Sequence, residues 1–375
     1  MKFSCTQNNL RRGLSAVSHV SGKQVNLPVL QNVHIKADGG GIVLSTTNLE
    51  IAIRTTVRGK IDISGEFTVP AKLLHDFVVL LSGDRVDVER VGEMLRLQCG
   101  DTTTTMNGMD AAEFPLIPSV EATHKVAIPG QALRDALAQV VFSVSTSEAR
   151  PELSGVLMKF EGNNLVLAAT DSYRLSERTV PLSGKVDTRQ LILPSQTAHE
   201  VHRMLSVYKD DPDVEDALEV RLSDTQAVFV YGAVELTTRT IDGTYPDYVQ
   251  IIPNEFATEA VVGRDELMKA VKTASLFSRP GVFDVTVQID PSAKKLSVKA
   301  TEATRGENTA GCEADVRGKQ NTITVNHRYL IDGLNACTSE GVTFKVIDAM
   351  NPCLLTPNGQ AAQGAYRYIV MPIRQ

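Results

Sequence analysis

The residues best suited to chemistry lie in the segment HEVHR, where Glu200 stands between His199 and His202. A zincin helix places its histidines four positions apart, so the spacing of three here argues against a zinc site. The acidic run DDPDVED at 210–216 lacks the Gly and the final Glu of a calcium loop and is interpreted as a solvated loop. The sequence also contains no nucleotide-binding or nucleophile motif. It therefore predicts no metal, no cofactor and no enzymatic activity.

Composition indicates a globular, intracellular protein. The 375 residues are 42% hydrophobic and 22% charged, and this length favours two or three domains. Five scattered cysteines without a C-x-x-C pair indicate a reducing cytoplasm. The apolar run from Phe77 to Leu81 is far shorter than the roughly 20 residues that span a bilayer, so no membrane partner is expected. A net charge of −6 argues against a surface that binds nucleic acid everywhere.

Three pairs of amphipathic helices are predicted, and they repeat at a constant offset. The first helix of each pair begins near 8, 130 and 264 and the second near 71, 195 and 327, so the offsets are 63, 65 and 63 residues. Spacings of i, i+4 and i+7 give the first helices their apolar faces. These faces are Leu10, Leu14 and Val17; Leu133, Leu137 and Val140; and Leu267, Val271 and Ala274. Ser195 and Asn326 are predicted N-caps.

Each repeat also contains a hairpin pattern between its two helices. The segments VHIKADGGGIVLSTT, VLMKFEGNNLVLAAT and VTVQIDPSAKKLSVKAT alternate with period two around turn residues. We therefore predict an α+β fold of three repeated domains, each with two helices packed on antiparallel sheets. The predicted boundaries are 1–122, 123–252 and 253–375.

Charge distinguishes the predicted helices from the rest of the chain. The six helices carry nine basic and six acidic residues, whereas the remainder carries 29 basic and 38 acidic. On composition alone two explanations stay open, solvated polar faces and a basic surface on the helical side. If two chains instead formed a ring of twelve inward-facing helices, ordinary helix packing would leave an opening of roughly 25 Å, wide enough for duplex DNA.

Several segments make the whole chain resemble the bacterial sliding clamp family, the beta subunit of DNA polymerase III. They are MKF, LPVLQNV, EFP, ATDSYRLS, DGTYPDY and the final YRYIVMPIRQ. The resemblance implies a non-catalytic processivity factor, a head-to-tail homodimer whose chains each form half of a closed ring around duplex DNA. It also implies a pocket for the polymerase III catalytic subunit, the clamp loader, and other polymerases and repair proteins.

The resemblance assigns residues to three surfaces. The partner-peptide pocket comprises Leu153, Thr170, Tyr173, Arg174, Leu175, Pro246, Ile251, Met350, Ile369, Met371, Pro372, Ile373 and Arg374. The expected DNA contacts are Lys23, Lys72 and Arg150 from the resemblance, together with Arg203, Lys269 and Arg328 from the basic residues of the predicted helices. Leu276 and Phe277 are expected to pack near Met106 of a second chain. A peptide-binding scaffold that does not act on DNA, and an enzyme with an unrecognised site, remain the alternatives.

Overall fold

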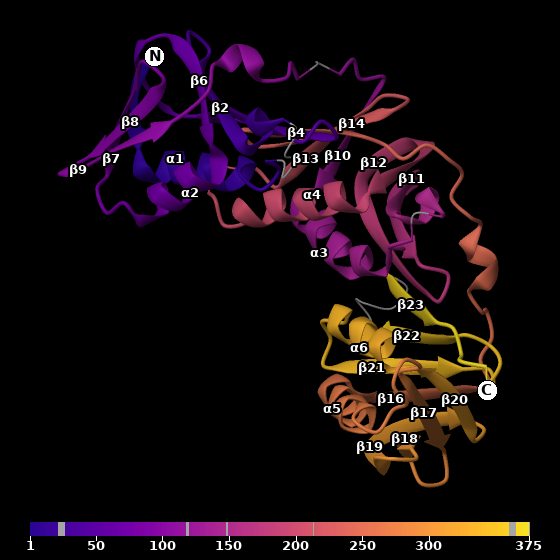
Figure 1. Cartoon of the computed structure of the whole chain (residues 1–375). Coiled ribbons are helices and arrows are strands. Elements are labelled where there is room, and N and C mark those ends of the chain that lie inside the picture. Colours follow the sequence, from indigo (N-terminus) through magenta and orange to yellow (C-terminus); the bar gives the residue numbers. More distant parts are fainter. Residues whose placement is uncertain (22–26, 118–119, 148, 213, 360–364, 375) are drawn as a thin grey trace. The chain divides into compact units, whose positions relative to one another are not determined.

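The computed structural model describes residues 1–21, 27–117, 120–147, 149–212, 214–359 and 365–374 (Figure 1). Backbone contacts group the chain into two compact units. Unit 1 comprises Met1–Arg134 and Gln196–Thr240, and unit 2 comprises Asp135–Ser195 and Ile241–Gln375. No helix of the described residues is long and apolar enough to cross a membrane.

The predicted helix pairs are confirmed in the described residues. They are α1 (Gln7–Val17), α2 (Ala71–Leu80), α3 (Gly130–Val140), α4 (Ser195–Val207), α5 (Arg264–Ser275) and α6 (His327–Ala336). The two helices of each pair begin at 7 and 71, 130 and 195, and 264 and 327, which gives offsets of 64, 65 and 63 residues. All nine apolar face residues named above are buried. Asn326 caps α6 as predicted, because its Oδ1 accepts from the backbone N–H of Arg328 at 2.9 Å.

Unit 1 holds two antiparallel sheets, with strand orders β5-β1-β7-β8-β9 and β10-β13-β14-β15-β4-β3-β2-β6. Helix α1 packs on β3 and β4 of the second sheet, with α2 beside it (Figure 1). The strands are β1 (Lys2–Thr6), β2 (Asn32–Asp38), β3 (Gly41–Thr47), β4 (Ile51–Val57), β5 (Gly59–Ile63), β6 (Gly65–Pro70), β7 (Arg85–Val91), β8 (Met94–Cys99), β9 (Thr102–Asn107), β10 (His124–Pro129), β13 (Ala217–Leu222), β14 (Gln226–Tyr231) and β15 (Val234–Arg239).

Unit 2 holds a ten-stranded antiparallel sheet of order β11-β12-β23-β22-β21-β16-β19-β18-β17-β20. The strands are β11 (Gly155–Thr170), β12 (Arg174–Pro194), β16 (Thr258–Gly263), β17 (Asp284–Asp290), β18 (Lys295–Glu302), β19 (Gly306–Gly318), β20 (Asn321–Asn326), β21 (Gly341–Val346), β22 (Cys353–Pro357) and β23 (Tyr366–Val370). Helix α6 lies directly on β23, because a Cβ added to Gly333 would stand 2.2 Å from a ring carbon of Tyr368.

Two strand pairs join segments that are far apart in the sequence. In the first seam, β15 pairs with β4, from Val234 opposite Thr55 to Thr238 opposite Ile51. In the second seam, β23 pairs with the start of β12, between Arg174 and Arg178. Each seam continues one sheet across two predicted domains. The compact units therefore group strands by sheet, and the three domain boundaries stay a prediction.

Candidate functional site

The turn between β11 and β12 is held by its own side chains. Ser172 adopts a positive φ of 77°. The Thr170 hydroxyl donates to the Arg174 carbonyl at 2.6 Å, and Asp171 Oδ1 accepts from the backbone N–H groups of Tyr173 and Arg174 at 3.0 Å. Such Asx-type bonds favour a tight turn locally. The turn leaves Tyr173 65% exposed and directs Arg174 into the protein.

The Arg174 guanidinium ties this turn to its surroundings in unit 2. Its Nε donates to Asp171 Oδ2 at 3.0 Å, and its Nη2 donates to the Phe142 carbonyl at 2.8 Å. Its Nη1 bonds to Asp332 of α6, and the guanidinium lies 4.6 Å from the centre of the Tyr329 ring. These contacts orient the turn, whereas the resemblance assigned Arg174 to peptide groups.

A buried apolar cluster lies beneath the turn and includes Leu153, Leu175 and Ile369 of the predicted pocket. Its members are Leu153, Leu157, Ala168, Leu175, Ile192, Tyr245, Tyr248, Ile252, Leu354 and Ile369. Burial raises the pKa of Tyr248, and the neighbouring Glu177 raises it further, so the phenol stays neutral. The cluster forms an apolar core beneath the turn.

The remaining predicted pocket residues form a partly exposed rim. Met350 is 60% exposed, Ile251 is exposed, and Pro246 is half-buried. The segment after β23 crosses the turn, because the Met371 N–H donates to the Tyr173 carbonyl at 2.9 Å. The Ile373 N–H then donates to the Thr324 carbonyl at 2.8 Å. This rim also includes half-buried Pro372 and exposed Arg374. Exposed Tyr173, Ile251 and Met350 thus border a buried apolar cluster, and apolar side chains of this kind line most ligand pockets.

The predicted DNA-contacting residues differ in how free their charges are. Lys72 and Lys269 are exposed on α2 and α5. Arg328 is exposed on α6, but its guanidinium lies 3.5 Å from the centre of the Phe283 ring. Arg203 instead bonds Glu200 at 2.8 Å and the carbonyls of Ser15 and Ala16 in the last turn of α1. Its charge therefore stabilises the end of α1.

Two further predicted DNA contacts stand apart from these helices. Arg150 is exposed and donates to Ser172 at 3.3 Å, so it borders the pocket turn. Lys23 lies outside the described residues.

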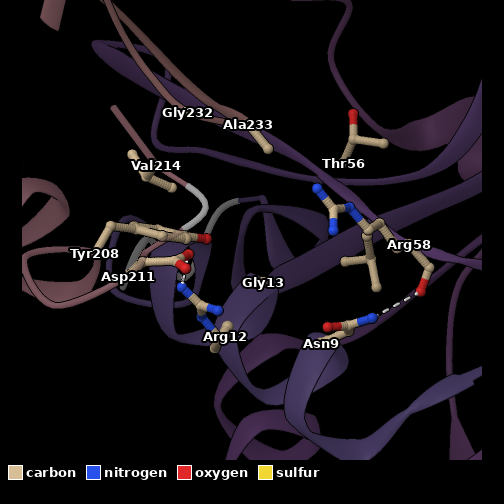
Figure 2. A pocket seen from close by; sticks show the side chains of 11 residues that line it. Asn9, Arg12, Gly13, Thr56, Arg58, Tyr208, Asp211, Val214, Gly232 and Ala233 are labelled. Atoms are coloured by element: carbon tan, nitrogen blue, oxygen red, sulfur yellow. Dashed lines mark hydrogen bonds and ion pairs between the residues drawn. The ribbon is translucent and has the colours of Figure 1, made fainter. Parts of the chain in front are cut away.

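A cavity of about 320 Å³ in unit 1 shows how one helical charge is neutralised (Figure 2). Arg12 of α1 pairs with Asp211 and lies 5.1 Å from the centre of the Tyr208 ring, while Asn9 donates to the Arg58 carbonyl at 3.3 Å. The Asp211 side chain is only 8% exposed. The prediction of a solvated loop at 210–216 is therefore wrong for Asp211, since sequence distance hid its partner.

The predicted dimer contacts lie in different environments. Leu276 is 66% exposed at the end of α5, and Phe277 is half-buried. Met106 is buried although it belongs to the edge strand β9. The Leu276 carbonyl accepts from Arg305 at 3.3 Å, which places Leu276 beside the loop that precedes β19. A partner strand could therefore reach the backbone of β9 but not the Met106 side chain.

Sequence reasoning missed the residues that support the pocket. Asp332 and Phe142 hold Arg174, but they lie 158 and 32 residues from it in the sequence. Asp171 was within reach, because Thr-Asp before a strand is a turn signal. Tyr245 and Tyr248 stood in the quoted DGTYPDY segment, where only Pro246 was selected.

Comparison with known proteins covers the entire chain. Models of the N-terminal, central and C-terminal domains of the DNA polymerase III beta subunit match residues 1–118, 127–247 and 249–374. The beta sliding clamp of Synechococcus elongatus is 31% identical over 379 residues, which cover 100% of this chain and 99% of the relative. That of Bacillus subtilis is 27% identical over 386 residues and 100% of both chains.

Solved structures agree with these matches. A DnaN sliding clamp from Pseudomonas aeruginosa, bound to griselimycin, is 25% identical with a TM-score of 0.92 over 100% of both chains. A DNA polymerase III beta subunit from Thermotoga maritima, 24% identical, shares the fold with a TM-score of 0.92 over 100% of this chain and 99% of that one. The predicted family resemblance and clamp-type α+β fold are confirmed.

Proposed function

Because the chain belongs to the DNA polymerase III beta subunit family of sliding clamps, we propose that two copies close head to tail into a ring around duplex DNA. The ring slides in the cytoplasm without reading sequence. Its peptide pocket tethers the polymerase III catalytic subunit, which gives processivity, and also receives the clamp loader and other polymerases and repair proteins. The protein itself catalyses no reaction.

The observation that carries this proposal is a strand pairing made twice within the chain. Strand β15 pairs with β4, and β23 pairs with β12. The corresponding strands of the outer domains are β9 and the start of β19. Among the described strands, β9 ends its sheet, and residues 306–310 of β19 pair only with β18. Edge strands bind further strands, so β9 of one copy fits β19 of another. Two such contacts close a ring.

The surroundings of the free β19 edge support the same contact. Leu276 is exposed beside the loop that leads into β19. Burial of one leucine side chain stabilises an interface by about 1.5–3 kcal/mol. Leu276 thus supplies an apolar anchor next to hydrogen-bonding backbone.

The pocket of unit 2 supports binding of short linear motifs. Its floor is apolar, its rim exposes Tyr173 and Met350, and methionine adapts to varied ligands. Extended peptides bind such surfaces through a few anchor side chains. One pocket can therefore serve several partners in turn.

Exposed basic side chains on three helices support sequence-independent contact with phosphates. Lys72, Lys269 and Arg328 stand on α2, α5 and α6. Contacts of this kind weaken with salt and carry no sequence information. Retention on DNA would then come from ring closure, with charge only centring the duplex.

A topological experiment tests the proposal. The purified chain is loaded onto nicked circular DNA by a bacterial clamp loader, and the circle is then cut. We expect the chain to stay on circles at high salt and to leave cut DNA. The variant Leu276→Asp with Phe277→Asp should be monomeric and not retained, because buried charges oppose the interface. Equal retention on circular and cut DNA would overturn the proposal. Peptide binding without topological retention would favour the scaffold.

A further inference from the structure

The seam strands of the three domains can be aligned by counting across the sheets from the helix starts. Ser4, Ala127 and Val261 each stand three residues before the first helix of a pair. The strand pairings lead from them to one equivalent position on β9, β15 and β23. In the first domain the path runs Ser4, Asp87, Gln98, Thr103. In the second it runs Ala127, Glu219, Val230, Glu235. In the third it runs Val261, Thr343, Thr356 and then Arg367, which stands opposite Thr356 when the register of Leu355 and Tyr368 is continued by one residue.

The partner strands β4, β12 and β19 align in the same way. Thr68 and Thr324 stand three residues before the second helices α2 and α6. The paths run Thr68, His34, Ser45, Arg54 and Thr324, Thr286, Lys299, Thr309. In the central domain, Ala168 stands two residues before the turn residue Thr170, just as Ser45 stands two residues before Thr47 in the first domain. Ala168 faces Glu177. The equivalent residues are therefore Arg54, Glu177 and Thr309.

At this position both seams carry a cross-strand ion pair, but with opposite polarity. In the first seam Glu235 faces Arg54, with Oε1 2.7 Å from Nη2. In the second seam Arg367 faces Glu177, with Nε 2.8 Å from Oε1. The Glu177 side chain is 5% exposed, so its charge depends on this partner. The residues left for the remaining pair are Thr103 and Thr309, both exposed.

We propose that this one position matches each strand edge to its correct partner: Glu235 with Arg54, Arg367 with Glu177, and Thr103 with Thr309 of a second copy. Every other combination sets like charges opposite each other, Glu235 against Glu177 or Arg367 against Arg54, or leaves one charge facing threonine. Like charges directly opposite destabilise an antiparallel pair. Three look-alike domains thereby avoid wrong pairings.

The neutral pair suits the contact between copies, and this part rests on the proposed head-to-tail dimer. Threonines facing each other across strands favour pairing. They also need no charge to be desolvated when the ring closes or exposed when it opens. The within-chain seams, which stay closed, carry the ion pairs.

Two double variants test the matching between copies. Thr103→Glu with Thr309→Arg reproduces the polarity of the first seam, whereas Thr103→Glu with Thr309→Glu sets like charges opposite each other. Both positions are exposed, so neither variant should disturb folding, which circular dichroism checks. A dimer contains the pair twice. The dissociation constant of the like-charged variant, measured by sedimentation equilibrium, should therefore be roughly 2- to 25-fold higher than that of the oppositely charged variant. Equal dissociation constants for the two variants would overturn the proposal.

A double-mutant cycle within one chain tests the edge matching independently of dimerisation. If the wild type proves monomeric, the proposed dimer is refuted, but this cycle still tests the matching. Arg54→Glu and Glu235→Arg should each lower the melting temperature of unit 1. The double variant restores opposite charges in reversed order and should recover part of the loss. The rest is the contact between Glu235 Oε2 and Arg221 Nη1, 3.6 Å apart, which the exchange turns into a repulsion. If the double variant lowers the melting temperature by as much as the two single variants together, the edge matching is also overturned.

Discussion

The turns at the two seams have the same backbone conformation and differ in their side chains. Leu49 and Ser172 both have a φ of 77°. Thr47 donates to the carbonyl four residues on at 2.9 Å, and Thr170 does the same at 2.6 Å. Asn48 of the first turn accepts hydrogen bonds from the backbone N–H groups two and three residues on, and Asp171 of the second turn does the same. The repeat has therefore preserved the frame of the turn in both domains.

The residue that ends each turn accounts for the difference. Ile51 is buried in the first seam, whereas its equivalent Arg174 reaches Asp332 and the Phe142 carbonyl. A cavity of about 250 Å³ at the first turn is lined partly by Leu49, Glu50 and Ile51. If the proposed pocket binds peptides, the neighbours that anchor the second turn distinguish it from the first turn.

The largest effect should follow from deleting residues 371–375. The deletion removes the rim segment whose Met371 N–H bonds the Tyr173 carbonyl and whose Ile373 N–H bonds the Thr324 carbonyl, so it acts on the second turn and leaves the first turn unchanged. We expect the affinity for a clamp-binding motif peptide to fall at least tenfold by fluorescence anisotropy, with the dimer intact by sedimentation. Glu50→Ala, at the first turn, is the matched control and should leave peptide affinity unchanged. An unaltered affinity after the deletion would contradict the pocket assignment.

Arg174→Ala should have the next largest effect. It removes a guanidinium with three partners and leaves Asp171 and Asp332 without their cation, at a cost of roughly 2–4 kcal/mol in unit 2. Peptide affinity should fall as well, because the turn loses its anchor. Ile51→Ala, at the equivalent position, should destabilise unit 1 by a similar amount through a cavity but leave peptide binding intact. Denaturation combined with peptide titration separates the two. Loss of binding in both variants would mean that the turns are not functionally distinct.

The smallest effect concerns alkaline pH. Burial raises the pKa values of Tyr245, Tyr248, Tyr366 and Tyr368 in unit 2. A group whose pKa is raised by folding loses its stabilising effect as pH rises above its unfolded value, about 10 for tyrosine. Each buried tyrosine then subtracts up to about 1.4 kcal/mol per pH unit. Among the described tyrosines of unit 1, only Tyr208 and Tyr231 have raised pKa values.

Cysteine labelling can report on this difference between the units. All five thiols are free and buried, with Cys5 and Cys99 in unit 1 and Cys312, Cys337 and Cys353 in unit 2. Burial raises the pKa of Cys5 and Cys337 to about 12, so folded protein should resist alkylation. Between pH 10 and 11 the thiols of unit 2 should be alkylated before those of unit 1, which mass spectrometry can follow. Earlier labelling of Cys5 would contradict the expected order.

Local pattern was enough to predict the elements but not their long-range partners. The helix starts and apolar faces followed from residue spacing, and Asn326 followed from capping chemistry. The seams could not be predicted in this way, because β4 and β15 lie about 180 residues apart and pairing leaves no local signal. The role of Arg203 was hidden for the same reason, since its acceptors belong to α1. The pocket residues came from family resemblance, and their support from Asp332 emerged only in three dimensions.

The contact between Gly333 and the Tyr368 ring has a practical consequence for genetic screens. Even one added methyl group would push α6 away from β23, and Asp332, the preceding residue, would move with it. If the proposed pocket recruits partners, substitutions at Gly333 should therefore weaken recruitment through Asp332 and Arg174. Compounds that displace this helix would then act on the proposed pocket indirectly.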